Sequence, residues 1–300
     1  MNPHDVVIVV ARHGERTDYI MRDAGENWVR TAARPWDTPL SAHGHTQGTK
    51  LGEQIASELQ RLELPALTQV YSSPLLRCRQ TAVAAARAFR EATRRSEDST
   101  NLSPAVLSSP LVRIEYGLSE SINESWYRSW SLPESDGTWG LRPKGQSSPI
   151  PETLHPASRA PVQALLDWKT TLATQNDMDP EMDTKYASRT RLDTPYTFHP
   201  PYMEARTDQR ERMRKAVEEL SVAGQTILLV SHGGPVTHLY EELTGNDWNV
   251  HGASSYCCYS IYRQPAGTNK WEALVINQSE YLHEKITFES HVSIDNLTKV

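Results

Sequence analysis

The fold of this chain is decided by a stretch near its N-terminus, Val6-Val7-Ile8-Val9-Val10-Ala11-Arg12-His13-Gly14-Glu15-Arg16. Its first half is an unbroken apolar run rich in β-branched residues, which predicts a strand buried on both faces. In an open α/β sheet, ligands bind just beyond the carboxyl ends of the strands. We therefore expect His13 to lie at the rim of a crevice.

The chemistry expected at His13 follows from the two arginines beside it, Arg12 and Arg16. Positive neighbours disfavour the protonated imidazolium and so keep the ring neutral. A neutral imidazole in a cationic pocket is an available nucleophile, and that combination suits attack on a phosphoryl group. The alternative interpretation is a basic loop, solvated at the end of a strand.

Composition and charge restrict the function classes. The chain has 300 residues, of which 38% are hydrophobic and 23% charged, and a net charge of −6. This balance argues against nucleic-acid and anionic-membrane partners, and no apolar run approaches the roughly eighteen residues of a membrane span. The three cysteines form no disulfide or zinc pattern, so we expect a cytoplasmic protein. We expect a single domain over residues 1–300.

Residues 17–45 form a long connection, and we expect it to be functional or to act as a lid. His43 and His45 lack a third metal ligand at a recognisable spacing, so exposed loop histidines are expected and no metal or cofactor is predicted. A helix is predicted over 46–62 because its leucine and isoleucine residues recur at helical spacing.

A second strand is predicted near 67–72, followed by a helix that runs to about Arg90. Ser73 is the expected N-cap and Pro74 the first helical residue. Arg77 is expected to face the crevice, where the helix N-terminus already favours an anion. Arg79 is expected to face solvent.

Residues 91–110 are predicted to be an exposed loop, and a third strand is predicted over 111–114. This strand delivers Glu115 and Glu120 to the same rim, where either carboxylic acid could protonate a leaving oxygen. For each glutamate taken alone, a helix N-terminal carboxylate or a loop salt bridge is the competing interpretation.

Residues 121–206 show little regular pattern and are interpreted as an insertion over the crevice. Its aromatic residues could line a substrate pocket or pack the insertion onto the domain; they are Trp126, Tyr127, Trp130 and Trp139. A short helix is expected around 160–173.

A helix is predicted near 208–222 with Gly224 as its stop signal, and a buried strand over 226–230 then ends in His232. His238 is expected to be an ordinary packed residue. Residues 256–262 and 271–276 alternate like a hairpin pair.

Three motifs occur in order along the chain: Arg12-His13-Gly14 with Arg16, Ser73-Pro74-x-x-Arg77-x-x-Gln80-Thr81-Ala82, and Val230-Ser231-His232-Gly233-Gly234. With these, the chain resembles the histidine phosphatase (phosphoglycerate-mutase-like) superfamily. The Arg-His-Gly-Glu-Arg variant and the later Glu-Tyr-Gly-Leu-Ser-Glu look most similar to two groups. These are the phosphatase domains of the ubiquitin-associated and SH3-containing signalling phosphatases, and related steroid-phosphate phosphatases.

The resemblance implies an α/β fold, a three-layer αβα sandwich with a mostly parallel central sheet and a loop-rich insertion over the active site. It also implies that His13 is the nucleophile that becomes phosphohistidine. Glu120 would be the proton donor, with Glu115 as the alternative. The residues that would bind the phosphoryl oxygens are Arg12, Arg16, Arg77 and His232.

Three functions remain open at this stage. The first is a metal-independent phosphomonoester hydrolase that acts on a phosphorylated small molecule or a phosphoprotein, with aryl or bulky organic phosphates preferred. The second is a phosphoglycerate-type mutase, although Gly-Leu-Ser-Glu-Ser here does not resemble the Glu-Arg-His-Tyr-Gly run of the mutases. The third is a catalytically silent relative that binds phosphorylated ligands. The sequence allows a homo-oligomer, but it predicts neither the oligomeric state nor the natural substrate.

Overall fold

The computed structural model describes residues 2–28, 32, 37–96, 110–121, 179–190 and 204–282. Its centre is a six-stranded sheet with the strand order β3-β2-β4-β1-β5-β6. The strands are β1 (Val6–Arg12), β2 (Gln69–Ser72), β3 (Val112–Ile114), β4 (Thr226–Ser231), β5 (Tyr259–Gln264) and β6 (Glu272–Gln278). Strands β1 to β4 run parallel, and β5 and β6 are added antiparallel at one edge.

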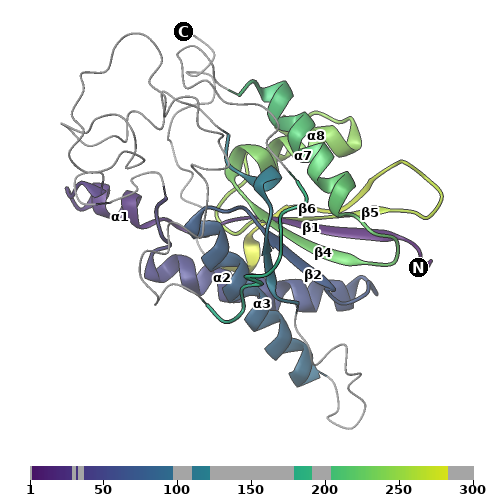
Figure 1. The fold of residues 1–300 in the computed structure, drawn as a ribbon, viewed down its shortest axis with the longest axis horizontal. Coiled ribbons are helices and arrows are strands. Elements are labelled where there is room, and N and C mark those ends of the chain that lie inside the picture. The colour runs from purple at the N-terminus through teal and green to yellow at the C-terminus, as the bar shows by residue number, and fades with distance from the viewer. Residues whose placement is uncertain are drawn as a thin grey trace.

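Helices cover both faces of this sheet (Figure 1). Helices α2 (Ala42–Arg61) and α3 (Leu76–Ser96) lie on one face, and α7 (Arg206–Leu220) and α8 (Gly233–Thr244) lie on the other. The short helix α1 (Thr17–Asp23) follows β1, and 3-10 turns occupy Tyr116–Leu118, Trp248–His251 and Glu280–Leu282. The predicted α/β sandwich with a mostly parallel sheet is confirmed.

Strand β1 contributes to two hydrophobic cores, one on each face of the sheet, because alternate side chains of a strand point to opposite faces. Val7 and Val9 pack with α2 and α3, whereas Ile8 and Val10 pack with α7 and α8. All four side chains are buried. The predicted burial of this strand on both faces is therefore confirmed, as is the core-facing stripe of α7, which consists of Met213, Ala216, Val217 and Leu220.

The strand register brings the loops that carry the motifs to one edge of the sheet. Arg12 is paired with Ser231, and Ser72 is paired with both Val230 and Ile114. Because β1 to β4 are parallel, their carboxyl ends meet, and the residues that follow each strand become neighbours. This edge is the expected position of a ligand.

Helix α2 begins earlier than predicted. Ser41 accepts a hydrogen bond from the Gly44 amide at 2.9 Å and caps the helix, so that Ala42 is already helical. His43 and His45 therefore lie in the first turn of a helix, and the prediction of loop histidines was wrong. The connection over 17–45 also contains α1, which the sequence did not predict.

Helix α3 differs from its prediction at both ends. Pro74 is not helical, since the helix starts at Leu76, whose amide donates to Asp37 Oδ1 at 2.6 Å. Arg79 is buried and lies 3.9 Å from Asp37, so the prediction that it faces solvent was wrong. Asp37, from a distant loop, thus accounts for both the later start of the helix and the burial of Arg79. At its other end the helix continues to Ser96, so residues 91–96 are not a loop.

Residues 179–190, which belong to the 121–206 segment, lie along the outer edge of β3. Met182 forms a parallel bridge with Val112 and is itself buried in the core. The Asp183 amide donates to the Val112 carbonyl at 2.9 Å. The expected helix at 160–173 and the residues Trp126, Tyr127, Trp130 and Trp139 lie outside the described residues.

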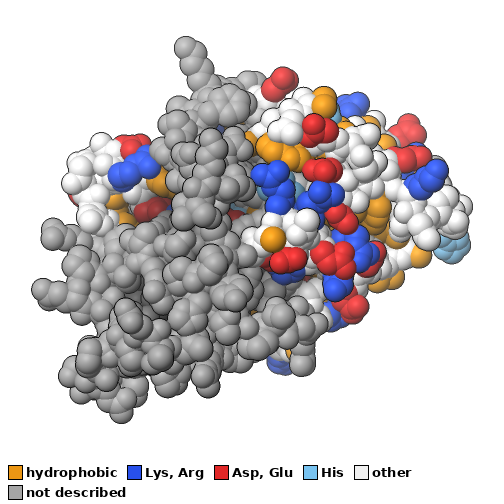
Figure 2. All heavy atoms as spheres, turned by 90° about the horizontal axis from the view of Figure 1, so that it is seen from above, with side chains coloured by type: hydrophobic (Ala, Val, Ile, Leu, Met, Phe, Trp, Pro, Cys, Tyr) orange, Lys and Arg blue, Asp and Glu red, His pale blue; other side chains and the backbone are white. Residues whose placement is uncertain are grey.

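The face that carries α7 and α8 shows acidic and basic side chains interspersed (Figure 2). Several of them form ion pairs between the two helices, such as Arg210 with Glu241 at 2.9 Å and with Glu242 at 3.0 Å. Within the described part of the chain, no helix is long and apolar enough to span a membrane.

Candidate active site

His13 follows the end of β1 and is buried. Its amide donates to the Ser231 carbonyl at 3.0 Å, and its carbonyl accepts from the Cys257 amide at 3.2 Å. The sheet hydrogen bonding therefore continues past the end of the strand and fixes the backbone of the residue. A side chain mounted on such a rigid backbone can be held in one orientation.

Gly14 allows the chain to turn away from the sheet against helix α2. A Cβ atom at Gly14 would lie 2.6 Å from the Gly44 carbonyl oxygen, and one at Gly44 would lie 2.3 Å from the Glu15 carbonyl oxygen. The amide of Gly14 donates to Thr81 Oγ1 at 3.0 Å. The two glycines let the loop and the helix N-terminus approach more closely than any side chain would permit.

The imidazole of His13 is held in one tautomer. Nδ1 lies 2.8 Å from the Gly14 carbonyl oxygen, an acceptor, so Nδ1 carries the hydrogen and Nε2 keeps its lone pair. Burial lowers the pKa of His13 well below its usual 6.5, and the positive charges of Arg77 and Arg12 lower it further. His13 is thus a neutral base with Nε2 as its available atom.

Arg77 lies against that atom. Its side chain is fully buried, and its Nε donates to His13 Nε2 at 3.3 Å. Its Nη2 lies 4.0 Å from Glu120 Oε2. The Arg77 guanidinium therefore lies between the His13 imidazole and the Glu120 carboxylate.

Arg12 and Arg16 flank His13 with partners of their own. Arg12 donates from Nη1 to the Ser254 carbonyl at 2.7 Å, and its guanidinium lies 4.4 Å from the centre of the Tyr256 ring. Arg16 is almost completely buried and forms a bidentate ion pair with Asp18, from Nε to Oδ1 at 3.0 Å and from Nη2 to Oδ2 at 2.6 Å. Both arginines lower the pKa of His13, Arg16 least.

His232 approaches His13 from the end of β4, with the two ring centres 5.3 Å apart in an edge-to-face arrangement. Its Nε2 lies 2.8 Å from Ser73 Oγ, and its Nδ1 lies 3.6 Å from Glu120 Oε2. Burial and the charge of Arg77 lower the pKa of His232 well below 6.5. Ser73, expected as a helix cap, instead orients this second imidazole.

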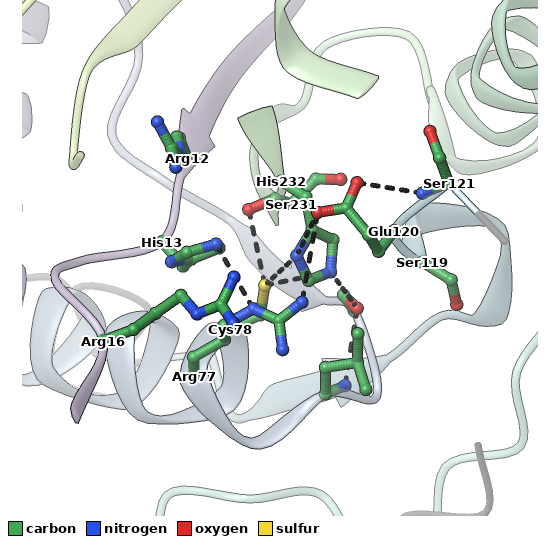
Figure 3. A network of polar contacts seen from close by, with 12 residues as sticks. Arg12, His13, Arg16, Arg77, Cys78, Ser119, Glu120, Ser121, Ser231 and His232 are labelled. Atoms are coloured by element: carbon green, nitrogen blue, oxygen red, sulfur yellow. Dashed lines mark hydrogen bonds and ion pairs between the residues drawn. The ribbon is translucent and has the colours of Figure 1, made fainter. Parts of the chain in front are cut away.

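Glu120 reaches the same point from the segment after β3 (Figure 3). Its side chain is 18% exposed, the most open of the four groups that meet here. The segment is fastened by Ser231 Oγ, which donates to the Leu118 carbonyl at 2.7 Å, and by Arg212 of α7. Arg212 donates from Nη1 to the carbonyls of Gly117 and Ser119 at 2.7 Å and 3.0 Å.

Glu115 has a different environment. It is fully buried, and its Oε2 accepts from Ser188 Oγ at 2.7 Å and from the amide and hydroxyl of Thr190 at 2.9 Å and 2.6 Å. Its Oε1 accepts from the Tyr186 hydroxyl and from the Arg189 amide. These donors all belong to the segment 179–190, so Glu115 anchors that segment to the end of β3.

The structure thus brings together His13, Arg77, Glu120 and His232, and it places Arg12 and Arg16 beside them. Sequence reasoning missed Arg212 and Tyr256, since neither belongs to a motif that signals the site. Cys78 was also missed, although it lies inside a quoted motif; its buried Sγ contacts His232 Nε2 at 3.4 Å. No group of three or more His, Cys, Asp or Glu placed to hold a metal ion occurs among the described residues.

The arrangement places three guanidinium groups around a buried, neutral imidazole at the carboxyl edge of the parallel strands. A family model described as the histidine phosphatase superfamily (branch 1) matches residues 8–102 and 171–278. The chain belongs to this superfamily, a class of phosphatase enzymes, as its sequence predicted. The narrower resemblance to signalling and steroid-phosphate phosphatases stays a prediction.

Solved structures with a similar fold include two phosphatases. One is a mycobacterial glucosyl-3-phosphoglycerate phosphatase, 18% identical, with a TM-score of 0.48 over 92% of this chain and 100% of that chain. The other is the ecdysone phosphate phosphatase from Bombix mori in complex with tungstate, 18% identical, with a TM-score of 0.49 over 96% of this chain and 97% of that chain. The comparison with curated proteins gave no match.

Proposed function

We propose that this chain hydrolyses phosphomonoesters in two steps through a phosphohistidine on His13, without a metal ion. The observation that carries the proposal is the state of the His13 ring. Its Nδ1 hydrogen is bound by the Gly14 carbonyl, and its Nε2 lone pair faces the Arg77 guanidinium. A phosphoryl group drawn to that guanidinium would meet the lone pair directly.

In the first step, His13 Nε2 attacks phosphorus and the bond to the ester oxygen breaks. Glu120, in its protonated form, donates its proton to the departing oxygen. In the second step, a water molecule attacks the phosphohistidine, the Glu120 carboxylate accepts the proton of that water, and inorganic phosphate leaves. One residue thus serves first as general acid and then as general base.

Charge stabilisation in this proposal comes from the arginines. Phosphoryl transfer depends mainly on positioning and on neutralising the phosphoryl oxygens. Arg12, Arg16 and Arg77 supply positive charge around His13, the function that a divalent cation serves in other phosphatases. His232 adds a ring nitrogen next to Glu120, as a further contact for a phosphoryl oxygen.

We further propose that the substrate carries its phosphate on an aryl or bulky organic group, in a small molecule or a phosphoprotein. Aromatic rings accompany two of the site's arginines: Tyr256 lies beside Arg12, and Tyr19 lies 4.4 Å from the Arg16 guanidinium. Such rings favour contact with an apolar or aromatic leaving group. The tryptophans of the 121–206 segment, which motivated the same expectation, lie outside the described residues.

The test is to trap the intermediate. Acid-labile, base-stable phosphate should accumulate on the wild-type chain during turnover of p-nitrophenyl phosphate, in EDTA as well as without it. The His13→Asn variant should form none. His4→Gln, which changes an exposed histidine far from the motifs, serves as the control and should form as much as wild type.

Two results would overturn the proposal. One is loss of turnover in EDTA that a divalent ion restores. The other is interconversion of 2- and 3-phosphoglycerate faster than the hydrolysis of any aryl, steroid or sugar phosphate in a panel, which would make the chain a mutase. Preference for sugar phosphates within that panel would overturn the substrate class alone.

A further inference from the structure

Helix α7 contacts the segment that carries Glu120 at two points one helical turn apart. Arg212 holds the carbonyls that precede Glu120 and also approaches the Glu120 carbonyl, at 3.4 Å from Nη2. Gln209, on the same face of the helix, reaches the residue that follows. The segment is therefore held on both sides of the carboxyl group.

Gln209 is a buried amide with both ends engaged. Its Nε2 donates to Ser121 Oγ, and its Oε1 lies 2.8 Å from His238 Nδ1. Ser121 in turn donates its backbone amide to Glu120 Oε1 at 2.9 Å. A continuous series of hydrogen bonds thus runs from helix α8 through helix α7 to the proposed general acid.

The donor at the far end of this series is fixed by its surroundings. Burial, together with the smaller effect of the Arg206 and Arg210 charges, lowers the pKa of His238 to about 4, so the ring is neutral near pH 7. Since Nδ1 faces the Gln209 carbonyl oxygen, Nδ1 carries the single ring hydrogen. The Gln209 amide is therefore oriented with its nitrogen towards Ser121.

Gly234, near the start of α8, leaves the space that this amide occupies. A Cβ atom there would lie 3.2 Å from Gln209 Nε2 and 3.6 Å from Ser121 Oγ. The glycine is helical and has no left-handed backbone angle that would require it. Its lack of a side chain is explained by the close approach of Gln209.

We infer that Gln209 is a positioning residue for catalysis, held by His238 over Gly234, and that it fixes through Ser121 the orientation in which Glu120 faces His232 and Arg77. The inference rests on the proposed role of Glu120 as general acid. A buried amide that loses its partners would leave Ser121 and Glu120 free to rotate. Gln209 itself touches neither substrate nor phosphoryl oxygens.

The experiment measures kcat/KM of Gln209→Leu for a series of phosphate esters that runs from p-nitrophenyl phosphate to an alkyl phosphate. For a reaction through a phosphoenzyme, kcat/KM reports the steps up to departure of the leaving group. We expect a loss of about tenfold or more for the alkyl ester and less than about threefold for the p-nitrophenyl ester, because acid assistance matters most for poor leaving groups. Inhibition by inorganic phosphate should stay within about twofold of wild type.

Three further variants make the result independent of folding defects. Gln54→Leu removes the hydrogen bond of another helical glutamine, to Tyr259, and should leave the whole series unchanged. His238→Asn keeps a donor near the Nδ1 position and should retain the wild-type dependence, whereas His238→Leu should behave like Gln209→Leu. If Gln209→Leu does not fold, this histidine pair decides the question.

Equal losses for alkyl and aryl esters, or no loss for either, would overturn the positioning role. Failure of the proposed function gives a different result: Glu120→Gln itself would then show no extra loss for alkyl esters. If Glu120→Gln shows that loss and both Gln209→Leu and His238→Leu do not, only the present inference falls.

Discussion

Two carboxylates five positions apart in the sequence occupy opposite kinds of environment. Glu115 lies in a cage formed by the segment 179–190, where hydroxyl and amide donors contact both of its oxygens. Glu120 lies in a pocket with guanidinium and imidazole groups at 3.6–4.0 Å and a partly open side chain. In the cage, donors and acceptors satisfy one another. In the pocket, positive charge and an imidazole lone pair are held side by side, an arrangement that suits an incoming phosphoryl group.

The difference supports the proposed division between a structural acid, Glu115, and a catalytic acid, Glu120, in one loop. Neutral donors occupy both oxygens of Glu115, so this carboxylate is not available for proton exchange with a substrate. Its role is to hold the segment 179–190 in place. Glu120 accepts one backbone hydrogen bond from the described residues and is partly open, so its carboxyl group is available for proton transfer with a substrate.

The largest expected effect is that of Glu120→Gln on catalysis. The amide cannot transfer a proton, so kcat/KM for alkyl phosphates should fall by about 10²–10⁴-fold, with a much smaller loss for p-nitrophenyl phosphate. The free energy of unfolding should change by less than about 1 kcal/mol, since the side chain is partly exposed. Steady-state kinetics and urea unfolding measure the two quantities; a uniform loss over all esters would assign the proton transfer elsewhere.

Glu115→Gln should show the converse pattern. Either amide orientation turns an NH₂ group towards at least two donors of the cage, and each unsatisfied buried group costs about 1–3 kcal/mol. We expect the free energy of unfolding to fall by about 3 kcal/mol, with kcat/KM for folded protein within about tenfold of wild type and no added preference for good leaving groups. Glu280→Gln, at an exposed position, is the matched control and should be neutral. Loss of proton transfer without loss of stability would exchange the two roles.

The smallest expected effect is the contribution of the two pocket histidines to the pH dependence of stability. His13 and His232 have pKa values below 6.5 in the folded chain, whereas both titrate near 6.5 when unfolded. As the pH falls below about 6.5, the unfolded state binds protons that the folded state does not, so stability decreases with a slope that approaches about 1.4 kcal/mol per pH unit for each histidine.

His13→Gln should remove one such contribution from the slope between pH 6.5 and 5, and Glu115→Gln should leave the slope unchanged. Urea unfolding at several pH values checks this. An unaltered slope in His13→Gln would mean that His13 is protonated in the folded state, which would contradict its proposed role as a nucleophile.

Much of this molecule was predictable from its sequence. The apolar run before His13 and the strand before His232 predicted their burial, because β-branched residues without alternation fit only a strand covered on both faces. Parallel strands then required their carboxyl ends, and hence the motifs that follow them, to meet at one edge. The strand ends that carry the motifs follow from that pattern, whereas the family and the phosphatase class were predicted from the resemblance of the three motifs to the histidine phosphatase superfamily.

Tertiary structure alone decided what each polar group does there. Glu115 and Glu120 have the same chemistry and lie in the same loop, and only packing against 179–190 satisfies one of them and leaves the other beside the imidazoles. Asp37 buries Arg79 and starts helix α3 from a distant loop, and Gln209 and Arg212 reach the acid from a helix that carries no motif. Local periodicity records which face of a segment is apolar, whereas hydrogen-bond partners far apart in the sequence are set by the way the segments fold together.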